Sequence, residues 1–248
     1  MKKDIKFTKY KKRGAYHWQQ ISNSILNHNA FVSARYNQVV NQIPKNPSQI
    51  ILDIGCGEGV LVYLIFKKTK SQITGIDTDQ LSLEFAKSKF KSLKVKAKFF
   101  KANAYKLPFK NNTFDTIVSA EVIEHLSDTH KYLSEIKRVL KPGGKVIITT
   151  PVKLSEIPKD KMHVKEFTPQ EFQEILNKYF KTINIKTSHP LFLRNLYILK
   201  LGKINRFYLE PFKWLINLWI ILTKLNPFKL SFGQPTNQIA ILKNSYDR

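Results

Sequence analysis

The chain has 248 residues, of which 42% are hydrophobic, and this length and apolar content predict one large α/β domain with appended elements. Its single cysteine, Cys56, excludes an internal disulfide and favours a reducing cytoplasm as the compartment. The net charge of +24 attracts any polyanion, so anionic lipid and nucleic acid are both candidate partners, but arginine, the better bidentate reader of phosphate, is scarce beside lysine.

The first part of the chain, residues 1–44, is predicted to be a basic N-terminus followed by a helical cap. Residues 1–13 carry seven cations and one acid, without the apolar core of a secretion signal, so we do not expect a signal peptide. From residue 14 to residue 43, large apolar side chains recur at helical spacing and predict two helices.

Residues 50–59 predict a buried apolar strand followed by three alternating glycines, and the apolar residues from Val60 onward predict a helix. Glycines at this point let a ligand approach the backbone, and the helix directs unpaired N–H groups toward it. The dinucleotide pattern needs a small residue where Val60 stands, and the Gly-Lys-Ser/Thr triplet of a P-loop is missing. The pattern therefore predicts a nucleotide-binding turn of another kind.

Strands and helices alternate along the rest of the chain, which predicts a parallel sheet with helices on both faces and the ligand at the carboxyl ends of the strands. The second strand, residues 72–77, ends in Asp77, whose carboxylate can accept both ribose hydroxyls of a nucleoside. Further strands are predicted at residues 181–188 and 237–243. Residues 99–104, 114–121 and 138–148 resemble the third strand, the fourth strand, and the helix, turn and fifth strand of the family that the glycine pattern resembles. Further helices are predicted at 79–90, at 127–140 with Ser127 as the N-cap, and after the Thr-Pro-Gln-Glu cap at 168–171.

The glycine pattern, with Asp53 two positions before it, resembles motif I of the class I S-adenosylmethionine-dependent methyltransferases, and the resemblance covers residues 45–188 in the order of that family. It implies a Rossmann-like, seven-stranded, mostly parallel sheet whose strand seven is antiparallel between strands five and six. The cofactor would be S-adenosyl-L-methionine. The resemblance places its contacts at Asp53, Gly55, Cys56, Gly57, Gly59, Asp77, Thr78, Asn103, Ala104 and Glu121.

Within this resemblance two of the contacts have specific roles. Asp77 would hold the ribose, and Asn103 replaces the more common aspartate that accepts from the adenine amino group, which an amide oxygen can also do. N-terminal helices often cover the active site in this family. Tyr16, His17 and Trp18 would therefore either close over the ligand or only pack against the core.

The chemistry is expected after strand four, in the Glu-x-x-Glu-His sequence of residues 121–125. On a helical turn Glu121, Glu124 and His125 share one face and could ligate a divalent cation such as Mg²⁺. This sequence resembles ubiquinone-biosynthesis O-methyltransferases and small-RNA 3′-end methyltransferases, and the latter add a second histidine, for which His163 is the candidate. Glu-His after strand four is also common among metal-free small-molecule methyltransferases, where the histidine is structural or lines the substrate pocket. His125 and His163 are the candidate general bases, because the unperturbed pKa of histidine lies near neutral.

Residues 189–236 form an insertion before the final strand at 237–248, rich in large apolar residues and lysines. Its longest apolar run, 214–222, is too short to span a bilayer. Two tryptophans beside lysines suit a membrane interface, which predicts peripheral contact through residues 205–230 on the inner face of the membrane. The alternative is a lid that packs on its own domain or on a second subunit.

Three functional hypotheses follow. The first is O-methylation of a small or lipid-linked acceptor, such as a quinone precursor or a lipid-linked sugar. The second is a metal-dependent RNA methyltransferase, favoured by the positive charge and by the Glu-x-x-Glu-His sequence together with His163. The third is a non-catalytic module that binds S-adenosylmethionine and recruits a partner.

Overall fold

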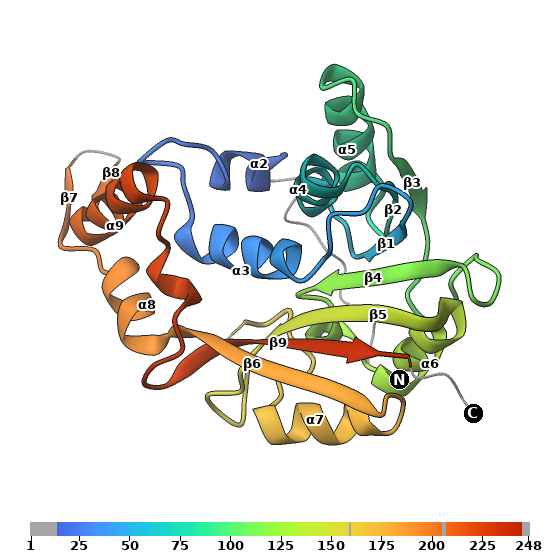
Figure 1. The fold of residues 1–248 in the computed structure, drawn as a ribbon. Helices are drawn as coiled ribbons and strands as arrows, with labels where there is room; N and C mark the ends of the chain where they lie inside the picture. Colours follow the sequence, from blue (N-terminus) through green and yellow to red (C-terminus); the bar gives the residue numbers. More distant parts are fainter. Residues whose placement is uncertain (1–13, 159, 205–206, 245–248) are drawn as a thin grey trace.

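The computed structural model describes residues 14–158, 160–204 and 207–244. The basic segment predicted at residues 1–13 lies outside them. A single seven-stranded sheet forms the centre of the molecule (Figure 1). In sheet order its strands are β3 (Lys98–Lys101), β2 (Gln72–Asp77), β1 (Ile50–Ile54), β4 (Phe114–Ala120), β5 (Leu140–Pro151), β9 (Pro235–Lys243) and β6 (Thr182–Pro190).

The predicted topology is confirmed. Strands β3, β2, β1, β4 and β5 pair in parallel, and β9 is antiparallel to both of its neighbours, β5 and β6. Parallel strands covered on both faces are continuously apolar, and Ile51, Leu52 and Ile54 of β1 are indeed buried. The order of the sheet reverses between β1 and β4, which opens a crevice at their carboxyl ends.

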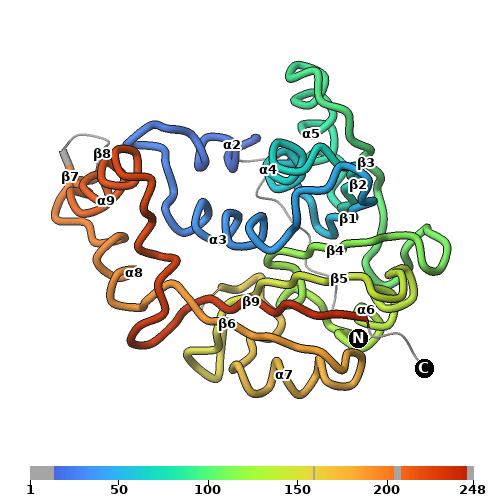
Figure 2. The backbone as a smooth tube through the Cα atoms, in the orientation of Figure 1, coloured from blue at the N-terminus to red at the C-terminus, as the bar shows by residue number. Residues whose placement is uncertain are grey.

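Helices cover both faces of the sheet (Figures 1 and 2). Residues of α3 (Ala30–Asn41), α4 (Val60–Thr69) and α5 (Gln80–Ser92) share one hydrophobic cluster with the sheet, and α2 (Tyr16–Gln20) adds Trp18 to its edge. On the opposite face, α6 (Thr129–Val139) and α7 (Pro169–Asn177) supply the second cluster. The Rossmann-like fold is therefore complete.

The cap predicted at Thr168 is confirmed at the start of α7. The Thr168 side chain accepts from the backbone N–H of Glu171, whose carboxylate accepts in return from the N–H of Thr168, with Pro169 at the first helical position. One prediction was wrong: Asp128, not Ser127, caps α6, because the Asp128 carboxylate accepts from the Lys131 N–H. The third strand is also shorter than predicted, because the chain turns at residue 103.

The insertion at 189–236 folds into a lobe of its own. It contains α8 (Leu191–Tyr197), the hairpin of β7 (Gly202–Ile204) and β8 (Phe207–Leu209), α9 (Pro211–Thr223) and the short turn η2 (Pro227–Lys229). The lobe stands beyond the N-terminal end of α3, at the left of Figure 1. A third cluster joins it to α3 through Ala30, Ala34, Tyr197, Ile220 and Phe228.

Candidate active site

A cavity of about 560 Å³ lies at the carboxyl ends of β1, β2 and β4. Its volume is in the range of small-molecule sites, about 300–1,000 Å³. Most of the residues predicted from the sequence line it, namely Gly55, Cys56, Gly57, Asp77, Thr78, Asn103, Ala104, Glu121, Glu124, His125 and His163. Asp53 and Gly59 are the two predicted contacts that do not line it.

The glycine loop after β1 has the backbone conformation for which glycine is needed. Gly55 has a φ of +74°, and a Cβ added there would lie 2.3 Å from the Cγ2 atom of Val122. Gly59 has a φ of +81° and begins α4 with no side-chain cap. The loop therefore leaves the N-terminus of α4 uncovered by side chains, as an anionic or polar ligand group requires.

Cys56 is buried within this loop, as expected of a small core side chain. Burial raises the pKa of its thiol well above the ordinary value, and the nearby carboxylates of Asp53 and Asp77 add to this effect. A raised pKa keeps the thiol protonated, so Cys56 is not a nucleophile at neutral pH.

Asp77 ends β2 and faces the cavity beside the glycine loop. Its Oδ2 atom accepts from the backbone N–H of Gly57 at 2.8 Å, and its Oδ1 atom accepts from Asp79 at 2.9 Å. Burial raises the pKa of Asp77, and these hydrogen bonds oppose the rise. Each carboxylate oxygen has a second lone pair, so Asp77 can hold the loop and accept ribose hydroxyls together.

Asp53 lies behind this arrangement, fully buried in β1. Burial, and then the charge of Asp77, raise the pKa of Asp53 well above its ordinary value. Its Oδ2 atom has no hydrogen-bond partner among the described residues. Asp53 does not line the cavity, and its contact with the cofactor stays a prediction.

Asn103 and Ala104 line the cavity in the turn after β3, on the same side of the crevice as Asp77. The Asn103 Oδ1 atom accepts from the backbone N–H of Tyr105 at 2.9 Å. This local bond fixes the turn. One lone pair on Oδ1 and the amide N–H groups remain for a ligand, because an amide oxygen accepts two hydrogen bonds.

The N-terminal cap forms part of the cavity wall. Of the three cap residues predicted together from the sequence, two line the cavity and one does not. Tyr16 and His17 line the cavity, and both the backbone N–H and the ring Nδ1 of His17 lie 2.7 Å from Oε1 of the buried Glu58. Trp18 instead packs against Tyr63, while its indole N–H donates to the Glu58 carbonyl. The cap is thus attached to the glycine loop through Glu58.

Two residues of α3, Arg35 and Tyr36, also line the cavity, although the sequence did not single them out. The Arg35 guanidinium lies 2.9 Å from the Glu121 carboxylate, and Tyr36 is beside it. Burial raises the pKa of the Tyr36 hydroxyl far above its ordinary value, so the ring stays neutral. The available sequence signal was Arg35 itself, an arginine within the predicted cap of a lysine-rich chain.

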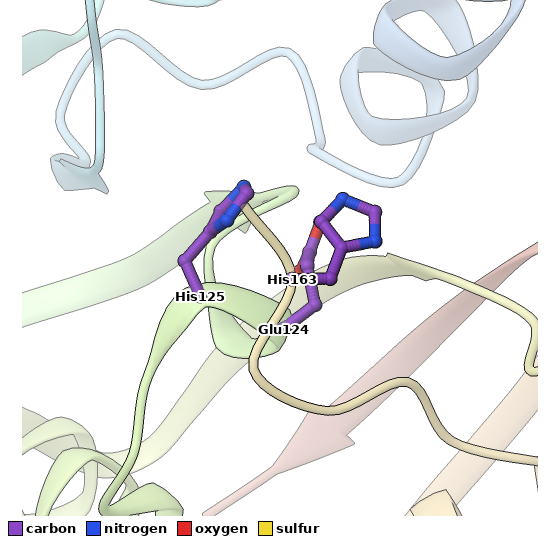
Figure 3. A group of neighbouring side chains, drawn as sticks. All are labelled: Glu124, His125 and His163. Carbon is purple, nitrogen blue, oxygen red and sulfur yellow. The ribbon is translucent and has the colours of Figure 1, made fainter. Parts of the chain in front are cut away.

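Glu124, His125 and His163 form the far end of the cavity, with one ligand atom of each side chain within 4.8 Å of the others. Figure 3 shows Glu124 and His125 on the turn after β4 and His163 on a separate loop beside them. The backbone carbonyl of Glu124 accepts from the N–H groups of Val164 and Lys165, which holds the two segments together.

Glu121 does not join this group, so the predicted set of four metal ligands is not assembled. The prediction assumed a helical turn from residue 121, but the turn is a short 3₁₀ segment, Ile123–His125. Glu121 precedes it with a φ of +59°, and its carboxylate meets Arg35 and the Asn237 amide instead. Glu121 still lines the cavity.

The hydrogen bonds of the two histidines define their basic nitrogens. The Nδ1 atom of His125 lies 2.7 Å from the Met162 carbonyl, and the Nδ1 atom of His163 lies 2.6 Å from the Glu166 carboxylate. Both acceptors require a proton on Nδ1, which makes Nε2 the basic atom of each neutral ring. Such rings act as general bases or as metal ligands with an ordered second shell.

Glu124 completes this end of the cavity. Its Oε2 atom accepts from the Thr150 hydroxyl at 3.1 Å, while its Oε1 atom is buried without a hydrogen-bond partner among the described residues. Burial, and then Glu121, raise the pKa of Glu124 well above the ordinary value. An unsatisfied carboxylate oxygen beside two imidazoles is the donor set of a divalent cation, so these residues fit one.

A parallel sheet with one antiparallel strand, a glycine loop after β1 and an acid at the end of β2 define the class I S-adenosylmethionine-dependent methyltransferase fold. Residues 45–187, more than half of the chain, match the family model described as a methyltransferase domain. The chain belongs to this methyltransferase family.

The chain is similar to an O-methyltransferase of Pyrenophora dematioidea, with 36% identity over 113 residues, which are 45% of this chain and 42% of that protein. It is also similar to a probable S-adenosylmethionine-dependent methyltransferase of Mycolicibacterium smegmatis, with 29% identity over 131 residues, 51% of this chain and 49% of that protein. These matches span about half the length of the curated relatives, or less.

Among solved structures, phosphoethanolamine N-methyltransferase 2 of Haemonchus contortus, in complex with phosphomonomethylethanolamine and S-adenosylhomocysteine, has a TM-score of 0.67. It shares 22% identity, and the alignment covers 96% of this chain and 58% of that one. At this identity the likeness establishes the fold. The coverage of this chain means that the likeness extends beyond residues 45–187.

Proposed function

We propose that this protein transfers a methyl group from S-adenosylmethionine to a hydroxyl group of a small or lipid-linked acceptor, such as a quinone precursor or a lipid-linked sugar. The supporting observation is one cavity that joins a nucleoside-binding end, formed by the glycine loop and Asp77, to a basic end, formed by His125 and His163. Its volume of about 560 Å³ is in the range expected of small-molecule sites.

S-adenosylmethionine supplies a methyl group that its sulfonium has already activated. The protein has to align the acceptor with the S–CH₃ bond, exclude water and accept a proton. The acceptor oxygen bonds to the methyl carbon while the carbon–sulfur bond breaks, and the hydroxyl proton passes to the Nε2 atom of His125 or His163. The Met162 carbonyl and the Glu166 carboxylate stabilise the imidazolium that forms.

A divalent cation is an alternative role for the same side chains, because an Nε2 atom that binds a metal cannot also accept the hydroxyl proton. Glu124, His125 and His163 would hold it, and it would lower the pKa of an acceptor hydroxyl. Two imidazoles and one carboxylate favour a transition metal over Mg²⁺. The same group, with the charge of +24, supports the second candidate, methylation of an RNA end.

The test incubates the purified protein with methyl-labelled S-adenosylmethionine and an extract of its host, and then separates lipid, RNA, protein and small polar fractions. We expect label in the lipid or small-molecule fraction, which would also exclude a non-catalytic module. Label confined to RNA, lost at high salt and on addition of a chelator, would replace this proposal by the RNA one. Unchanged turnover with a chelator would assign the histidines as bases without metal.

A further inference from the structure

Helix α9 is apolar on its buried side as well as on its exposed side, because Ile216 and Ile220 pack inward against α3. Its one central polar residue, Asn217, is buried, whereas its leucines face outward. The Asn217 amide donates to the carbonyls of Ile25 and His28 at 2.7 and 3.0 Å, and its oxygen accepts from the Tyr197 hydroxyl at 2.9 Å. A helix on a water-facing surface buries its apolar side chains and exposes its polar ones. The hydrogen bonds of Asn217 hold its side of the helix inward, so the leucines on the other side stay exposed.

The outward face of α9 consists of Leu215, Leu218, Trp219 and Leu222, spaced as one stripe along the helix. Leu215 is 62% exposed, Trp219 is 54% exposed and Leu222 is 72% exposed. Phe192, Leu201 and Leu225, elsewhere in the lobe, are also exposed. We call Leu215, Leu218, Trp219 and Leu222 the α9 face. Single exposed apolar residues are common, but a grouped set marks an interaction surface.

The lobe that carries the α9 face is positively charged. Lys200, Lys203, Lys213, Lys224 and Lys229 belong to the same lobe, and Glu210, the only acid in residues 189–236, forms an ion pair with Lys213 at 2.6 Å. Lys224 and Lys229 line a second cavity, of about 240 Å³, between α9 and α3. Lys200 lies 3.8 Å from the centre of the Tyr208 ring.

We propose that the α9 face binds the surface of an anionic phospholipid bilayer. Exposed leucines and a tryptophan can enter the boundary between headgroups and acyl chains, while nearby lysines meet the headgroup phosphates. A second copy of the chain would bring the same excess of lysines and repel it, so charge favours the anionic membrane as the occupant. In the described part of the chain, none of the helices has the length and apolar content needed to traverse a bilayer.

The N-terminal cap connects this surface to the active-site cavity. Its Ile25–His28 end is held by Asn217 of α9, and its other end, at His17, is held by Glu58 of the glycine loop. Through the cap, the lobe that would meet the bilayer is linked to one wall of the cavity. This part of the inference rests on the proposed function, since it explains how a lipid-linked acceptor would reach the site; binding to vesicles does not depend on it.

The test measures co-sedimentation of the full chain, without S-adenosylmethionine, with vesicles of phosphatidylcholine alone and with added phosphatidylglycerol. We expect binding that needs the anionic lipid and weakens with salt. The triple variant Leu215→Ser/Trp219→Ser/Leu222→Ser is expected to lose about tenfold or more of this binding. The matched control is Ile157→Ser, whose side chain is 81% exposed outside the lobe, and it should bind as the wild type does.

A second pair of variants tests the lysines if the triple variant folds poorly. Lys224→Gln/Lys229→Gln should reduce the preference for anionic vesicles, and Lys87→Gln/Lys91→Gln, which removes the same charge from α5, should not. Absence of sedimentation, or equal binding by wild type and variants, would overturn the proposal. So would self-association in sedimentation velocity that the triple variant abolishes while vesicles remain unbound, since the α9 face would then be a dimer interface. A separate titration with S-adenosylmethionine reports on the proposed function alone.

Discussion

The Arg35 guanidinium of α3 lies 2.9 Å from the Glu121 carboxylate at the end of β4, and both side chains are less than one-fifth exposed. This ion pair joins the N-terminal cap to the sheet at the wall of the cavity. Removing one member leaves a largely buried charge without its partner. The resulting loss in the free energy of unfolding is larger than the net contribution of the intact pair.

The first prediction follows from that pair. Glu121→Gln is expected to lower the free energy of unfolding by about 2 kcal/mol, and Arg35→Met/Glu121→Gln by clearly less than the sum of the single variants. Urea unfolding of the four proteins measures the coupling. The exposed pair Lys153–Glu156 serves as the control and should show no measurable coupling. Additive effects at Arg35 and Glu121 would contradict this account.

The second prediction concerns the glycine loop. Gly55→Ala forces a side chain into a left-handed backbone and into Val122, whereas Gly233→Ala has a similar φ and open space around it. We expect Gly233→Ala to lower the free energy of unfolding by about 1 kcal/mol. Gly55→Ala is expected to lower it by more, and also to weaken binding of S-adenosylmethionine. Thermal unfolding and ligand titration compare them. Adding Val122→Ala should restore part of the loss; equal behaviour of the two glycine variants would count against the predicted clash.

The third prediction concerns pH. His189 is buried against Phe31, and burial lowers its pKa from 6.5 to about 4. Between these values the unfolded chain binds a proton that the folded chain does not, so stability falls as the pH falls. We expect this residue to account for about 3 kcal/mol of the loss between pH 7 and pH 4. His189→Asn, which tolerates the φ of +62°, should lose less stability over that range in urea unfolding. An unchanged pH dependence would contradict this assignment.

The sheet could be predicted because its signals are local. An apolar run, a glycine turn and a strand ending in an acid lie within a few residues of one another, and the observed β2 has the predicted bounds. The antiparallel orientation of β9, and its position between β5 and β6, were predicted from the family resemblance. At the start of α6, Ser127 and Asp128 are both good N-cap residues, so the sequence alone could not show which of the two caps the helix.

The active site was predictable only where it depends on such local signals. Glu124, His125 and His163 meet as expected, but Glu121 departs because the helical turn begins later than assumed. Arg35 reaches the cavity through the packing of α3 across the sheet, which no local pattern encodes. For α9, the sequence indicated an apolar run with tryptophans beside lysines. The burial of Asn217 was not predictable, because it depends on the distant Tyr197, Ile25 and His28.

The central claim is that the cavity beside Asp77 binds S-adenosylmethionine, and isothermal titration of the purified protein with that compound tests it most directly. We expect one site, and a loss of affinity of about 10- to 100-fold for Asp77→Ala, because the ribose loses its carboxylate acceptor and the Gly57 N–H loses its partner. Asp79→Asn, which keeps the cap of α5, should bind as the wild type does. No binding by the wild type, or binding that Asp77→Ala leaves unchanged, would contradict the account.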